Sequence, residues 1–125
     1  MRDLWEWQRR GPRASGHRRD ALWLAALVHR LSGLALAAFL PLHFLALALA
    51  LKGEAAFDGF LRWTANPLVK IAEMGLIFCL SVHALGGIRL LLVESLPWFQ
   101  GQKQLMAGAL LTASLLALLF LVRAA

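Results

Sequence analysis

The sequence has few charged residues and a single cysteine. Only 16% of its 125 residues are charged, whereas 60% are hydrophobic. A soluble domain of this size cannot bury so much apolar surface, because surface-to-volume scaling limits its core. The lone cysteine, Cys79, excludes a disulfide framework and a metal site built from cysteines.

Acidic residues are also scarce, with 7 against 13 lysines and arginines. The net charge of +6 could suggest nucleic-acid binding, but half of the excess lies within residues 1–20, before the first span. No basic, aromatic-rich soluble domain follows, so we expect no nucleic-acid partner. Because no extramembrane domain of any size is present, we expect one subunit of a larger assembly.

Three long apolar runs predict an all-α membrane protein embedded in the lipid bilayer. The expected transmembrane helices cover about residues 22–51, 67–94 and 104–122. They make up a domain over residues 21–125, after a basic tail over residues 1–20. The tail is no signal peptide, because the apolar stretch after it is about twice as long as a secretory core. We expect it at the headgroups or against a partner, or as a disordered segment that fixes topology.

Local signals predict where the helices begin. Asp20 is the expected N-cap of the first helix, and Asn66 with Pro67 is the expected start of the second. Aromatic residues at near-helical spacing predict a short surface helix between them. Lys70 and Glu73 can form an ion pair at i,i+3.

The third span has almost no polar side chains, and its small residues predict a packing role. These are the pair Gly108 and Thr112 and the series Ala109, Ala113 and Ala117.

The distribution of lysine and arginine favours a cytoplasmic N-terminus. Six arginines precede Asp20 and Arg30 follows, whereas the connection over residues 52–70 has three basic residues. This orientation places Arg30 and Arg89 at the same cytoplasmic edge.

The most informative stretch lies in the second span, from His83 to Arg89. Polar side chains inside a membrane face a partner, a cavity or a cofactor. Gly86 and Gly87 lie one helical turn after His83, so a nitrogen ligand has no side-chain bulk beside it. A flat cofactor such as haem needs such a surface. Close helix packing, with the histidine hydrogen-bonded across the interface, explains the pattern equally well.

A second histidine, His43, lies within the first span, and antiparallel packing would bring it near the depth of His83. Arg30 and Arg89 would lie above both. Haem b has an iron that binds imidazoles and propionates that bind cations, and an arginine near the interface also suits quinone carbonyls. The simpler interpretations are a histidine bonded to a carbonyl and arginines anchored at lipid headgroups.

Two motifs resemble signatures of the cytochrome b membrane-anchor subunit of succinate dehydrogenase (complex II). The segment from His29 to Gly33 resembles the signature H-R-x-[ST]-G at the start of the first span. The segment from His83 to Arg89, followed by Glu94, resembles the second signature, H-x-x-x-G-[hydrophobic]-R with a later acid. The resemblance covers about residues 22–122.

The resemblance implies an electron-transfer subunit in the cell inner (cytoplasmic) membrane, within the tricarboxylic acid cycle. In this family the anchor and a second small anchor subunit form a heterodimeric helical bundle, which holds an iron–sulfur subunit and a flavoprotein subunit. Electrons from succinate reach a quinone, either ubiquinone or menaquinone. The complex is the enzyme, and we expect no catalytic residues for succinate oxidation on this chain.

The resemblance also implies residue roles. His83 matches the ligand of the haem iron, and His43 resembles a histidine of branches with two haems, which leaves the number of haems open. The expected contacts of the haem propionates are His29, Arg30 and Arg89. The expected quinone contacts are Arg30, Ser32 and Ala26.

Three residues depart from the family pattern. Ala26 stands where many members have a serine that contacts the quinone. Leu90 follows Arg89 where a histidine is frequent, and Glu94 replaces the usual aspartate.

Two other functions remain open from the sequence. One is a haem-free structural anchor for a soluble oxidoreductase, with histidines that only stabilise the bundle. The other is a small transporter subunit, which is less well supported because no internal repeat or pair of broken helices is present.

Overall fold

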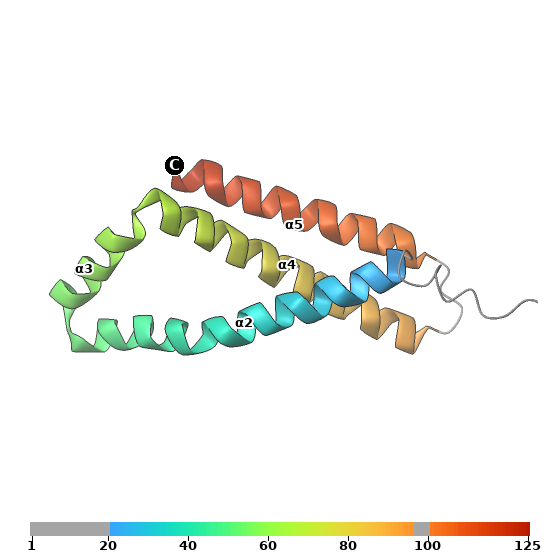
Figure 1. The fold of residues 1–125 in the computed structure, drawn as a ribbon, viewed down its shortest axis with the longest axis horizontal. Helices are drawn as coiled ribbons and strands as arrows, with labels where there is room; N and C mark the ends of the chain where they lie inside the picture. The colour runs from blue at the N-terminus through green and yellow to red at the C-terminus, as the bar shows by residue number, and fades with distance from the viewer. Residues whose placement is uncertain (1–20, 97–100) are drawn as a thin grey trace, which may run out of the picture.

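A computed structural model describes residues 21–96 and 101–125, which form four α-helices (Figure 1). The helices are α2 (Ala21–Lys52), α3 (Glu54–Thr64), α4 (Pro67–Ser95) and α5 (Gln102–Ala124). The predictions for the basic tail and the Asp20 cap lie outside the described residues.

Three of these helices, α2, α4 and α5, are long and apolar enough to cross a membrane. This finding confirms the all-α membrane fold with three spans. Each helix begins and ends within two residues of its expected span. The prediction of a short helix between the first two spans is also confirmed, since α3 occupies that connection.

The helix ends follow from local chemistry. The Asn66 side chain accepts a hydrogen bond from the backbone N–H of Leu68 at 2.9 Å, and Pro67 is the first residue of α4, as predicted. Lys70 and Glu73 form the predicted ion pair at 3.1 Å. Gly53 separates α2 from α3 with φ of 125°, a conformation that favours glycine.

The helices do not form a parallel stack (Figure 1). Helix α4 runs back between α2 and α5; α2 crosses it near one end and diverges from it towards α3. We call the end with the starts of α2 and α5 the N-terminal end, and the opposite end the α3 end. Helix α2 is therefore close to α4 and α5 at the N-terminal end and far from them at the α3 end, where α4 and α5 remain side by side (Figure 1).

Few side chains are buried among the described residues. They are Val82, Ala113, Ala117, Ser32 and Thr64. The buried alanines confirm the packing role of α5, which lies mainly against α4. Gly108 and Thr112 are exposed, so this second pair does not pack within the chain. Exposed leucines cover the outer faces of the helices, and lipid or another subunit must cover these side chains.

Candidate functional site

Two histidines from neighbouring helices form the polar centre of the N-terminal end. The rings of His29 on α2 and His83 on α4 are stacked, with centroids 4.3 Å apart and planes inclined by 2°. The Nδ1 atom of His83 lies 3.1 Å from the backbone carbonyl oxygen of His29 and 3.4 Å from the Ser32 hydroxyl. The buried Ser32 hydroxyl donates to the same carbonyl at 2.9 Å.

These contacts decide which nitrogen of His83 is free. A carbonyl oxygen only accepts, so Nδ1 carries the hydrogen and donates it to His29. The Ser32 hydroxyl already gives its own hydrogen to that carbonyl. In the neutral imidazole of His83, Nε2 then keeps its lone pair, which is the form that binds a metal.

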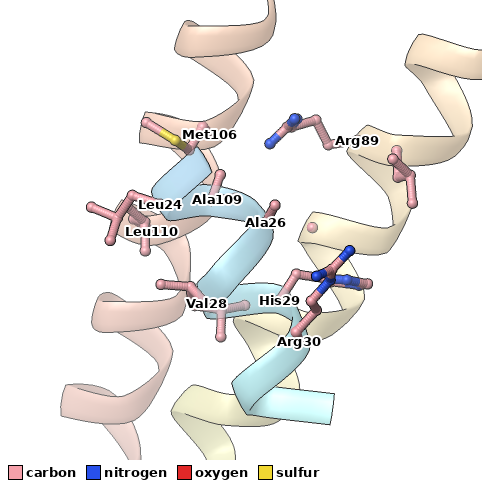
Figure 2. Close-up of a pocket in the computed structure, with 13 residues that line it drawn as sticks. Leu24, Ala26, Val28, His29, Arg30, Arg89, Met106, Ala109 and Leu110 are labelled. Atoms are coloured by element: carbon pink, nitrogen blue, oxygen red, sulfur yellow. The ribbon is translucent and has the colours of Figure 1, made fainter. Parts of the chain in front are cut away.

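A cavity of about 260 Å³ lies at the same end, between α2, α4 and α5 (Figure 2). Helix α2 contributes Ala26, His29 and Arg30 to its walls, and α4 contributes Arg89. Helix α5, for which the sequence predicted packing alone, contributes apolar side chains. These are Met106, Ala109 and Leu110.

Arg89 is a charged residue in the wall of this cavity. Figure 2 shows its side chain extending from α4 towards α2 and α5. Its Nε atom is the one buried side-chain nitrogen or oxygen without a hydrogen-bond partner in the described part of the chain. A buried donor left unpaired costs about 1–3 kcal/mol, and more on a charged group. Because Arg89 lines the cavity, a carboxylate or a carbonyl oxygen there is a suitable acceptor for its guanidinium.

The structure thus brings together most of the predicted site. Ala26, His29, Arg30 and Arg89 surround one cavity, and Leu90 also lines it. His83 and Ser32 are not in the cavity wall; they lie beside each other where α2 and α4 meet, and His83 adjoins the wall through its stacking with His29.

His43 lies elsewhere, and the expectation that it reaches the depth of His83 is wrong. His83 meets α2 at Ser32, and His43 is about 16 Å further along that helix. The reason is the crossing of α2 and α4, which occurs near the N-terminal end. His43 is exposed and contacts the rings of Phe39 and Phe44, with centroids 5.4 and 6.4 Å from its own.

A second, larger cavity of about 810 Å³ at the α3 end contains His43 in its wall. Its lining is mostly apolar and comes from α2, α3 and α4. Thr64 and Glu73 are among its few polar residues. Within residues 21–96 and 101–125, His43 has no hydrogen-bond partner.

Sequence reasoning missed the direct contact between His29 and His83. Both motifs contain a histidine followed by a glycine four residues later, and the two helices are antiparallel. That repeated spacing was a signal that each histidine faces the glycines of the other motif.

Comparisons with known proteins agree with this architecture. The family model for the succinate dehydrogenase/fumarate reductase transmembrane subunit matches residues 13–122. The chain is also similar to the succinate dehydrogenase 2 membrane subunit SdhC of Mycobacterium tuberculosis. The two are 30% identical over 95 residues, which cover 76% of this chain and 68% of that protein. Because the match extends over most of the three-span domain, the chain belongs to the family of succinate dehydrogenase/fumarate reductase transmembrane subunits.

Proposed function

We propose that this chain is the cytochrome b anchor of a succinate dehydrogenase complex, where it binds haem b and helps to form a quinone site. The observation that carries the proposal is the hydrogen bond from His83 Nδ1 to the His29 carbonyl, because it leaves Nε2 as an iron ligand. Haem b in such a site supplies one-electron transfer.

The surrounding residues fit the rest of a haem. Its propionates are carboxylates, and the guanidinium of Arg89, which lines the cavity, is a charged donor for one of them. His29 and Arg30 border the same cavity and can bind the other. A second ligand to the iron would come from the partner anchor, since among the described residues the one histidine beside His83 is the stacked His29.

A quinone would bind at the same end through Arg30. This arginine is exposed at the cavity, where its guanidinium can donate to a quinone carbonyl while the tail remains in lipid. Ala26 offers an apolar wall in place of a hydroxyl. Ser32 is buried and donates a hydrogen bond to the His29 carbonyl, which supports a role in holding the contact between His29 and His83. Its contact with quinone stays a prediction.

His43 is the residue that would hold a second haem. It is too far along α2 to share the iron of His83, but its imidazole is exposed beside the larger cavity.

The exposed apolar faces support a partner anchor, and the basic N-terminal end supports contact with the iron–sulfur subunit, which in turn carries the flavoprotein. A cytoplasmic N-terminus in the inner membrane agrees with the arginines in the tail and at positions 30 and 89.

A haem-free anchor is the second candidate, and one observation favours it. The stack of His29 on His83 and the bonds of Nδ1 already join α2 to α4 without any cofactor.

The test is a reduced-minus-oxidised spectrum with a pyridine haemochrome assay on the purified complex. One haem b per chain supports His83 with a ligand from the partner and leaves His43 structural. Two haems make His43 a ligand as well. A complex without haem overturns the cytochrome assignment and leaves the haem-free anchor.

A further inference from the structure

The two stacked histidines each rest on a glycine of the opposite helix. A Cβ atom built on Gly33 of α2 would lie 2.9 Å from Cε1 and 3.2 Å from Nδ1 of His83. A Cβ atom built on Gly86 of α4 would lie 3.0 Å from Cδ2 of His29. Ordinary contact begins at 3.4 Å, so the His83 ring must shift to admit a methyl group at position 33, and the His29 ring must give by a few tenths of an ångström to admit one at position 86.

We propose that Gly33 and Gly86 are positioning residues. Because they have no side chain, the imidazoles of His83 and His29 pack directly against them, and this packing fixes the orientation of His83. The two contacts are reciprocal, because His29 and Gly33 lie on α2 whereas His83 and Gly86 lie on α4. At the crossing, each helix therefore supplies one histidine ring and the glycine against which the other helix's ring packs.

The His83 ring has little freedom to avoid a methyl group at position 33. It would have to retreat by about 0.5 Å to reach ordinary contact with the new Cβ. The same ring is held at Nδ1 by the His29 carbonyl and is covered on one face by the His29 ring. A retreat therefore stretches the hydrogen bond that sets the tautomer, or separates the helices.

The other glycines provide matched controls. A Cβ on Gly87, next to Gly86, would lie 3.6 Å from His29 Nε2, which is ordinary contact. Gly75 on α4 and Gly108 on α5 would have nothing within 4 Å. Alanine is a better helix former than glycine, so these three substitutions should leave stability unchanged or raise it.

The first experiment compares thermal melting of the purified complex across this series. We expect Gly33→Ala and Gly86→Ala to lower the melting temperature by about 2–4 °C, and Gly87→Ala, Gly75→Ala and Gly108→Ala not to lower it. The loss should disappear when the ring is removed too, in Gly33→Ala with His83→Ala and in Gly86→Ala with His29→Ala, each compared with its histidine variant. The His29 pair keeps the proposed iron ligand, so it remains informative if the His83 variants do not assemble.

The second experiment reads the orientation of His83 itself. Only this part rests on the proposed function. In a complex that contains haem, Gly33→Ala should shift the largest g-value of the ferric haem in electron paramagnetic resonance and its midpoint potential, because the ligand ring moves. Gly75→Ala, at a position with no neighbouring atom within 4 Å of the new Cβ, should change neither. A purely structural role for Gly33 would change melting but not the spectrum.

The outcomes separate the two proposals. A wild-type complex without haem overturns the proposed function. The melting series still tests whether the histidine rings pack against Gly33 and Gly86. Equal melting and equal spectra for Gly33→Ala and Gly75→Ala would overturn the inference. A melting loss that persists without the rings would overturn it as well.

Discussion

The two ends of the helix bundle place their histidines in opposite surroundings. At the N-terminal end, His83 is held by the His29 ring, the His29 carbonyl and Ser32. At the α3 end, His43 is exposed, contacts two phenylalanine rings and borders a cavity of about 810 Å³. A fixed imidazole with one free nitrogen is preorganised for a metal, whereas His43 would need its ligand to order it. The two residues also differ in position, because His43 lies about 16 Å along α2 from Ser32, which is beside His83.

The largest difference between the ends should be seen in quinone reduction. Arg30→Ala removes the donor at the N-terminal cavity, and we expect a loss of about 10–100-fold in succinate:quinone activity, since a charged hydrogen bond contributes about 1.5–3 kcal/mol. Electron transfer from succinate to an artificial dye should persist. The matched control is Arg62→Ala on α3, which should keep both activities. Equal loss of quinone and dye reduction in Arg30→Ala would indicate an assembly defect instead.

Two buried hydroxyls offer a closely matched comparison. Ser32 and Thr64 each donate to the carbonyl three residues earlier at 2.9 Å, but only Ser32 also lies beside a histidine, His83. Removing either hydroxyl, in Ser32→Ala or Thr64→Val, should cost about 0.5–1.5 kcal/mol of stability, measured by thermal melting. We expect only Ser32→Ala to shift the haem midpoint potential. A similar shift in Thr64→Val would show that the potential follows general stability rather than the contact with His83.

Substitutions at the start of α4 should change the stability of the complex but not its haem. Asn66→Ala removes the side chain that accepts from the Leu68 N–H, at a cost of about 1 kcal/mol. Melting of the complex should fall by a few degrees, while the haem spectrum stays unchanged. Asn66→Asp, which can cap the same helix, should restore the melting temperature. Failure of this rescue would show that the cap does not set stability here.

The smallest effect is expected from the ion pair near the start of α4. Lys70 and Glu73 are partly exposed, so Glu73→Gln should cost only about 0.3–0.5 kcal/mol. The difference in melting from the wild type should shrink in high salt, because salt screens the pair. A larger, salt-independent loss would mean that Glu73 acts through the α3-end cavity that it lines.

The helices themselves were predictable from the sequence. Long apolar runs limit where a chain can cross a membrane, and Asn66 with Pro67 marks the start of α4 through local chemistry alone. The arginines at the N-terminal cavity were also predictable, since both lie near the same end of antiparallel helices.

The pairing of the histidines was not predictable from helix lengths. Which residues of α2 meet His83 depends on where the two helices cross, and close approach at Gly33 and Gly86 sets that point. Counting residues from each helix end assumes helices side by side along their whole length, and it therefore paired His83 with His43. The contribution of Met106 to the cavity was missed for a related reason, because an apolar helix carries no signal of what it faces.

The most direct test of the account compares the haem content of His83→Ala with that of the wild type in the purified complex. Cys79→Ala is the matched control, because it removes a half-buried side chain one turn earlier on α4. We predict that His83→Ala loses one haem b per chain in the pyridine haemochrome assay, while Cys79→Ala loses none. An unchanged haem content in an assembled His83→Ala complex would contradict the assignment of His83 as the iron ligand.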